Sequence, residues 1–351
     1  MNPRPAEGRF IRQSAWKRDS RKLDFQSFEF SEVAPSLVTP HTFPRCVTWR
    51  GCRSPRRPDY PVFISWWPRW GAEREAALDR VRTNGAELEY ELSGTGEPVV
   101  FIHGAFIAET FRPLLAEPTL AGHYRLILYH RRGYVGSSRA SGPVSLAQQA
   151  ADCRALLRHL GAEQAHVVGH SYGGDIALQL ALDTPGVVHS LALLEPALMV
   201  GVSEKGYRES LARGVERYRE AGAAVVVDEF LQARWPGYRA DLERALPGAI
   251  AQAVADAGTS FEGELPALLG WRFGEAEAQR ISQPALSVLG EGEALWSRRS
   301  ETHRLLLAWL PHAEGFVLPG ARHFLMLEDP RGTAEVLGAF WARHRLPAGV
   351  A

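Results

Sequence analysis

One stretch of the sequence joins a buried strand to a helix through a glycine-lined turn that holds a serine. It reads AHVVGHSYGGDIALQLAL over residues 165–182. The first residues are branched and apolar, as in a buried strand, and apolar residues recur at helical spacing from Ile176 onward. The junction has the form Gly-x-Ser-x-Gly, with Ser171 between Gly169 and Gly173. Glycines at these two places remove side chains that would collide with strand and helix, so the turn raises the serine hydroxyl above a sheet edge.

Strands and helices alternate along most of the chain. The apolar patterns predict strands at 87–92, 98–103, 125–130, 165–170, 189–195, 284–290 and 315–320. They predict helices at 145–160, after Ser171, at 305–310 and at 335–344. Such alternation is typical of an α/β fold with a mostly parallel, doubly wound sheet covered on both faces. Right-handed crossovers bring the carboxyl ends of these strands to one edge, where binding sites collect.

One segment, residues 197–280, interrupts this alternation and reads as helices only. We call it the insertion. It follows the carboxyl end of a predicted strand, at the same edge as Ser171, and this position predicts a helical cap over the site. The alternative is an extra helical layer that only stabilises the core.

The first 80 residues carry no sustained helical or strand period. They predict an irregular, disordered extension before an α/β domain at residues 81–351. Residues 54–71 mix basic and aromatic side chains, so an arm that binds nucleic acid or a partner protein is the alternative for that part.

The composition excludes several classes of protein. Lys+Arg and Asp+Glu both number 40, so the net charge gives no case for nucleic acid or an anionic membrane. No apolar run approaches the roughly 20 residues that span a bilayer. Cys46, Cys52 and Cys153 fit no zinc spacing and cannot all pair. With no secretory signal at the N-terminus, a reducing, cytoplasmic location is predicted.

Several motifs together resemble the α/β-hydrolase family, over about Val81 to the C-terminus. His103-Gly104 follows a strand where that family has its oxyanion loop, and residues 131–137 resemble its RGxGxS loop, with His130 where aspartate is common. GHSYGG resembles its nucleophile elbow, and LPGARHFLMLEDP (318–330) resembles its histidine loop. The resemblance implies a capped member with a serine nucleophile.

The resemblance and the chemistry assign the same roles. Ser171 is the expected nucleophile, and His323 is the expected base that takes its proton. A tetrahedral oxyanion needs two backbone donors, which we expect from the N–H groups of Tyr172 and Ala105, with Phe106 as the alternative to Ala105.

The acid that orients His323 is open among three glutamates. The family usually carries its carboxylate just after the strand that follows the cap, where this chain has Glu291 and Glu293. Some members use a glutamate just after the strand that precedes the cap, and here this is Glu195. We take Glu293 as the first expectation, with Glu195 and Glu291 as alternatives. Asp175 is assigned to the dipole of its helix.

The sequence therefore predicts a serine hydrolase that cleaves an ester, thioester or related acyl bond through an acyl-serine intermediate. A carbon–carbon hydrolase, a perhydrolase or an acyltransferase would use the same triad, and a non-catalytic ligand receptor is the alternative from another class. Phe106, Trp235 and Trp271 are the expected substrate-binding residues, for an apolar small-molecule acyl ester. No cofactor, metal or nucleic acid is expected, and the oligomeric state is open.

Overall fold

The computed structural model describes residues 10–12, 78–140, 142–293 and 297–347, and these residues contain one sheet of nine strands. The strand order is β1-β9-β8-β7-β6-β4-β5-β3-β2, and the six strands from β9 to β5 run parallel. The antiparallel strands β1, β2 and β3 lie at the two ends of that order. The bounds are β1 (Phe10–Arg12), β2 (Asp79–Thr83), β3 (Ala86–Ser93), β4 (Glu97–Ile102), β5 (Tyr124–Tyr129), β6 (Ala165–His170), β7 (Val188–Leu194), β8 (Ala285–Gly290) and β9 (Ala313–Leu318).

The predicted α/β fold with a mostly parallel sheet is confirmed, and each of the seven predicted strands is present. Two further strands were not predicted. β2 pairs with β3 across Asn84 and Gly85, which both have positive φ values, as a two-residue hairpin turn requires. β1 pairs with β9 as a three-residue edge strand, and it lies inside the segment for which the sequence predicted irregular chain. The sequence does not predict it because so short a strand shows no alternation of apolar and polar residues.

Helices cover both faces of the sheet. On one face lie α2 (Leu146–His159), α3 (Tyr172–Asp183) and α10 (Arg298–Trp309), and on the other lie η2 (Arg112–Ala116) and α12 (Pro330–Arg343). Alternate residues of β4 therefore enter different cores: Val100 and Ile102 one, Val99 and Phe101 the other. The predicted start of α2 is confirmed, because the Ser145 hydroxyl accepts a hydrogen bond from the N–H of Gln148 (3.1 Å).

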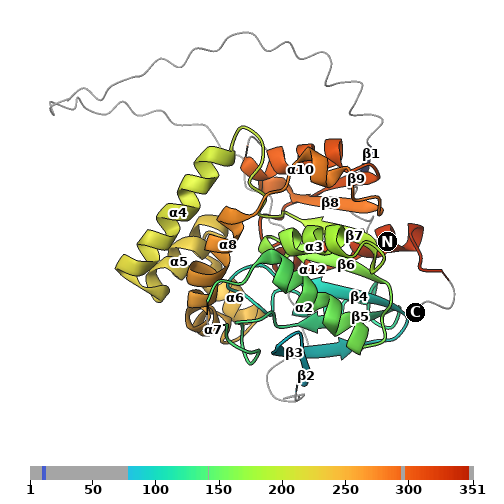
Figure 1. The fold of residues 1–351 in the computed structure, drawn as a ribbon, viewed down its shortest axis with the longest axis horizontal. Helices are drawn as coiled ribbons and strands as arrows, with labels where there is room; N and C mark the ends of the chain where they lie inside the picture. The colour runs from blue at the N-terminus through green and yellow to red at the C-terminus, as the bar shows by residue number, and fades with distance from the viewer. Residues whose placement is uncertain (1–9, 13–77, 141, 294–296, 348–351) are drawn as a thin grey trace, which may run out of the picture. The chain divides into compact units, whose positions relative to one another are not determined.

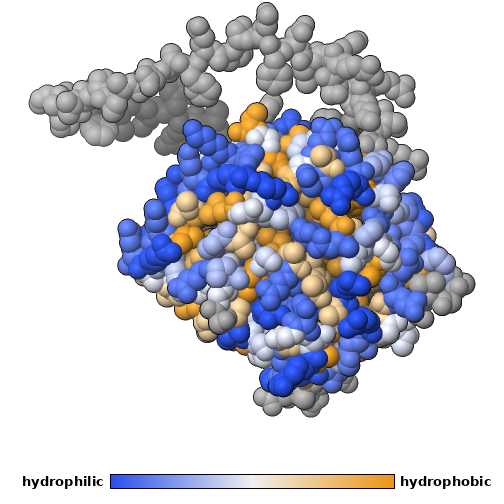
Figure 2. All heavy atoms as spheres, viewed as in Figure 1, coloured by the Kyte–Doolittle hydropathy of each residue, from blue (hydrophilic) through white to orange (hydrophobic). Residues whose placement is uncertain are grey.

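The insertion contains only helices and loops, as predicted. Its helices are grouped beside one end of the sheet in Figure 1, in yellow to orange. They are α4 (Glu204–Ala221), α5 (Ala223–Arg234), α6 (Tyr238–Ala245), α7 (Ala249–Ala255), η3 (Thr259–Glu264), α8 (Leu265–Gly270) and α9 (Glu275–Ala278). In Figure 2, hydrophobic residues are visible next to the hydrophilic side chains that cover α4. Val227, Leu231, Tyr238 and Leu242 are fully buried, and they belong to the same hydrophobic core as Val99 and Phe101 of β4.

The basic and aromatic segment 54–71, with Cys46 and Cys52, lies outside the described residues. Cys153 is buried in α2. Within the described ranges, no helix combines the length and the apolar character needed to cross a bilayer.

Candidate active site

Ser171 lies at the turn between β6 and α3, in a backbone conformation that residues other than glycine rarely adopt (φ 51°, ψ −122°). A Cβ at Gly169 would collide with the carbonyl group of Gly173, and a Cβ at Gly173 would collide with the carbonyl oxygen of Ile102. The two glycines are therefore required by close approach of backbone to backbone, as the sequence predicted for a strained turn.

His323 lies in the loop between β9 and α11 (Leu325–Glu328), and its ring contacts a carboxylate from another strand. Its Nδ1 donates a hydrogen bond to Oε2 of Glu195 (2.8 Å). Glu195 is the first residue after β7 and has a φ of 47°. The other oxygen, Oε1, accepts from the N–H of Gly290 at the end of β8 (2.8 Å), and the Arg299 guanidinium lies 3.2 Å from Oε2. Both oxygens are thus held in a buried, polar setting.

Of the three glutamates left open by the sequence, Glu195 is the one that contacts His323 among the described side chains. Glu291 is exposed, and its carboxylate accepts from the N–H of Gly320 (2.9 Å) instead. The first expectation, Glu293, ends the short helix η4 (Glu291–Glu293), and its side chain lies outside the described residues. The sequence signal for Glu195 was its place directly after a buried strand, and the pairing of β7 with β8 brings it to the sheet edge.

Two histidines of the site, His170 and His323, are buried and favour the neutral form. Burial, together with the positive charge of Arg299, holds the pKa of His323 well below its usual value. Burial also lowers the pKa of His170 to about 4, and its Nε2–H donates to the carbonyl oxygen of His323 (2.8 Å). His170 therefore packs against the histidine loop and fixes the backbone at His323.

The expected oxyanion donors lie on both sides of Ser171. Tyr172 begins α3, so its N–H is one of the helix's unpaired donors. The loop after β4 approaches from the other side: a Cβ added at Gly104 would lie 3.1 Å from Cβ of Ser171. The next residues of that loop are Ala105 and Phe106, and Phe106 has a φ of 69°.

A cavity of about 540 Å³ brings these residues together. Ser171, Tyr172, His323, Ala105 and Phe106 all line it. The insertion supplies much of the remaining wall, and its apolar contribution consists of Leu211, Val226, Phe230, Phe261, Leu265 and Leu268. The cavity thus lies between the sheet edge and the insertion.

Two of the three expected substrate-binding residues do not line this cavity. Trp235 is buried against Phe324, with ring centroids 5.8 Å apart. Trp271 stacks on Phe273, and its indole N–H donates to the Gln179 side chain (2.6 Å). Both tryptophans pack the insertion against the α/β domain, which departs from the prediction. Phe106 lines the cavity, and it packs against two phenylalanines of the insertion that the sequence did not single out, Phe230 and Phe261.

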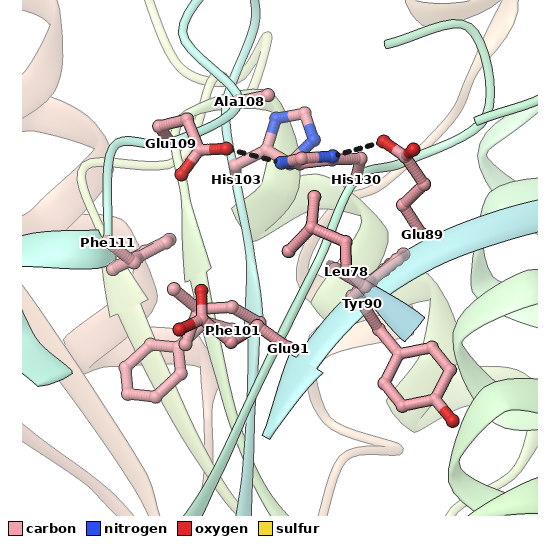
Figure 3. Close-up of a pocket in the computed structure, with 12 residues that line it drawn as sticks. Leu78, Glu89, Tyr90, Glu91, Phe101, His103, Ala108, Glu109, Phe111 and His130 are labelled. Carbon is pink, nitrogen blue, oxygen red and sulfur yellow. Dashed lines mark hydrogen bonds and ion pairs between the residues drawn. The ribbon is translucent and has the colours of Figure 1, made fainter. Parts of the chain in front are cut away.

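His130 stands where the family commonly has aspartate, and two carboxylates flank it. Figure 3 shows its ring between the side chains of Glu109 and Glu89. Nε2 lies 2.7 Å from Oε1 of Glu109, and Nδ1 lies 3.0 Å from Oε2 of Glu89. Burial alone would lower the pKa of His130, but hydrogen bonds and charges from the two glutamates raise it above its usual value. This group lies near His103, on the loop that follows β4, and does not line the cavity that holds Ser171.

Within the described residues, no group of three or more His, Cys, Asp or Glu side chains could hold a metal ion. The arrangement around Ser171 instead combines a hydroxyl, a neutral imidazole bonded to a carboxylate, and backbone N–H groups. These are the parts needed for nucleophilic attack and for stabilising an oxyanion.

Comparison with known proteins identifies the family. Residues 97–330 match the family described as the alpha/beta hydrolase fold. A dihydrolipoyllysine-residue acetyltransferase component of the acetoin cleaving system of Cupriavidus necator is 35% identical over 143 residues, which are 40% of this chain and 38% of that protein. A fluoroacetate dehalogenase of a Burkholderia species is 37% identical over 109 residues, which are 30% of this chain and 36% of that protein.

The chain spans about two fifths of the length of the first curated relatives that it matches. Among solved structures, a thermophilic esterase of Thermogutta terrifontis superposes with a TM-score of 0.66 at 20% identity, covering 76% of this chain and all of that one. That likeness shows the fold, and the family match covers most of the described sheet and the whole insertion. The chain belongs to the α/β-hydrolase fold family.

Proposed function

We propose that this protein is a serine hydrolase that cleaves an ester, a thioester or a related acyl bond through an acyl-serine intermediate. Ser171 Oγ attacks the acyl carbon while Nε2 of His323 accepts the hydroxyl proton. The same proton then passes to the leaving group, and water repeats the sequence to release the acid and regenerate Ser171. Glu195 holds the tautomer of His323 with the proton on Nδ1 and stabilises the imidazolium that forms.

The observation that carries the proposal is the hydrogen bond between Nδ1 of His323 and Glu195, beside a serine held at positive φ in the same cavity. A neutral imidazole with Nδ1 protonated leaves Nε2 as the acceptor that a serine nucleophile needs.

The lining of the cavity favours a substrate with an apolar part. Phe106, Phe230 and Phe261 form an aromatic group against which an acyl or alcohol chain can pack. A cavity of about 540 Å³ lies in the range that holds small organic ligands. We therefore propose an apolar or aromatic acyl ester as the substrate class.

The test is hydrolysis of p-nitrophenyl esters of increasing acyl length by purified wild-type protein and by the Ser171→Ala variant. We expect wild-type turnover that Ser171→Ala loses, together with labelling of Ser171 by a fluorophosphonate probe. Full activity of Ser171→Ala on every hydrolysed ester would reject covalent catalysis by this serine. Folded wild-type protein that neither hydrolyses an ester nor reacts with the probe would favour a ligand receptor.

An acyltransferase is the second candidate, because the Cupriavidus necator relative is named as an acetyltransferase component. The first half-reaction would be the same, and a different nucleophile would take the acyl group from Ser171. Adding an alcohol or thiol acceptor to the ester assay separates the two functions. A transferase produces more of the new ester or thioester than of the free acid, whereas a hydrolase releases mainly acid.

A further inference from the structure

A buried arginine behind the candidate oxyanion loop uses all of its hydrogen-bonding capacity. Arg131 follows β5 and is 1% exposed. Its Nε donates to the carbonyl oxygen of His103 and its Nη2 to that of Gly104, both at 2.9 Å. Nη1 donates to the side chains of Gln149 and Glu264, and Nη2 also reaches the second oxygen of Glu264 (3.4 Å). These five bonds match the five N–H groups of a guanidinium.

Two of these bonds, to the carbonyl oxygens of His103 and Gly104, determine how the peptide groups of the candidate oxyanion loop are oriented. In a trans peptide, the carbonyl of one residue and the N–H of the next point in opposite directions. A bond from Arg131 to the Gly104 oxygen therefore turns the N–H of Ala105 away from the arginine. The imidazole of His103 adds a second restraint, because Nδ1 donates to the same oxygen (2.8 Å) and Nε2 accepts from the backbone N–H of Arg131 (3.0 Å). The Gly104–Ala105 peptide is thus held from behind by two side chains.

The carboxylate that compensates Arg131 comes from the insertion. Glu264 ends η3, is 1% exposed and lines the cavity that holds Ser171. Its Oε2 also accepts from the hydroxyl of Tyr134 (2.7 Å), a residue of the RGxGxS-like loop. Within the described residues, Glu264 is the carboxylate in contact with this guanidinium. An insertion that moved away from the sheet would leave Arg131 buried without its counter-charge, which is strongly unfavourable.

We propose that Arg131 and Glu264 are positioning residues, through which docking of the insertion sets the oxyanion-hole N–H of Ala105. The inference rests on the proposed acyl-serine function. It means that the oxyanion hole is complete only while η3 is docked. If the cap opens to admit substrate, the N–H of Ala105 is no longer held in the orientation of a donor. Arg131 itself touches neither the substrate cavity nor Ser171, and it acts through the Gly104–Ala105 peptide.

The test uses two variants of the full-length chain. Glu264→Gln keeps the size of the side chain and removes its charge. The double variant Arg131→Met with Glu264→Leu removes both charges, so no unpaired buried ion remains to unfold the protein. Both are compared with wild type for kcat and KM on a p-nitrophenyl ester, for affinity toward a boronic acid that forms a tetrahedral anion on the serine, and for Tm.

A second ion pair between the insertion and the same loop provides the matched control. Asp256 bonds Arg139 (2.6 Å) and the N–H of Val135 (3.0 Å), but it contacts neither His103 nor Gly104. Asp256→Asn should lower Tm through lost docking contacts and leave kcat close to wild type. Loss of one oxyanion donor typically lowers turnover by about 10²–10³-fold, and this is the upper range that we expect for the double variant.

The expected result is a fall in kcat for both test variants, about tenfold or more for Glu264→Gln, with little change in KM and a parallel loss of boronic acid affinity. If both variants stayed folded and their kcat equalled that of Asp256→Asn, the positioning role would be refuted. The proposal that Ser171 carries out hydrolysis would be unaffected by that result. Full activity of Ser171→Ala in the same assay would reject both the positioning role and the proposed function.

Discussion

Replacing Glu195 with glutamine tests which carboxylate completes the site. The carboxylate bonds Nδ1 of His323 at 2.8 Å, which places the two charge centres about 4 Å apart when the imidazolium forms. At an effective dielectric constant of about 20, their attraction is worth about 4 kcal/mol. A glutamine removes this charge whichever way its amide is turned, so Glu195→Gln should lower kcat by about 10³-fold.

The assay is steady-state hydrolysis of the best p-nitrophenyl ester, with kcat expressed per mole of folded protein and Tm measured alongside. Glu291→Gln and Glu293→Gln make the same chemical change at the two other glutamates considered. Glu291 is exposed and bonds Gly320 rather than His323, so its variant should retain wild-type kcat. The reasoning would be refuted if Glu195→Gln kept wild-type turnover while Glu293→Gln lost about 10³-fold.

Three further outcomes are expected. Gly173→Ala should destabilise the protein by about 1–3 kcal/mol or more in urea unfolding, because the new Cβ meets the backbone of β4. Gly186→Ala places its Cβ in open space and should leave stability unchanged. Equal Tm values for the two variants would contradict this. Burial holds the pKa of His323 well below its usual value of about 6.5, so the imidazole stays neutral and can act as a base below pH 6.5. A pH profile of kcat/KM should therefore keep its plateau at about pH 6.5 and fall only at lower pH. A fall in kcat/KM with a midpoint at or above about pH 6.5 would contradict this. Trp271→Phe removes the hydrogen bond to Gln179, so it should lower the free energy of unfolding by about 1 kcal/mol and leave kcat/KM unchanged. A raised KM for long-chain esters would instead place Trp271 against the substrate.

The fold and the elbow could be predicted from the sequence because their signals are local. The apolar periods on either side of Ser171 and the glycines beside it follow from the geometry of a few consecutive residues. β2 shows no apolar alternation, because its strand is short and mostly charged, and the Asn84-Gly85 turn is its one local signal. The edge strand β1 had no comparable signal in its three residues.

The identity of the acid and the lining of the cavity depend on long-range packing. Glu195 reaches His323 because β7 pairs with β8 in one register, and its place directly after a buried strand does not by itself show which side chain it contacts. In the insertion, the face that each helix turns toward the sheet decides which aromatic residues line the cavity. Phe230 and Phe261 face it, whereas Trp235 packs against the α/β domain, and composition alone does not separate these cases.

The chain order of Ser171 and Glu195 has a consequence for how this protein could be altered. Both residues directly follow neighbouring strands of one sheet, β6 and β7, and the N–H of Ser171 donates to the carbonyl oxygen of Leu194 (3.0 Å). Both precede the insertion, so a transplanted helical segment of another length would leave their spacing intact. The transplant would have to bring one feature of the original with it, a carboxylate that reaches Arg131. Substrate selectivity could then be exchanged as a module, subject to that single electrostatic requirement.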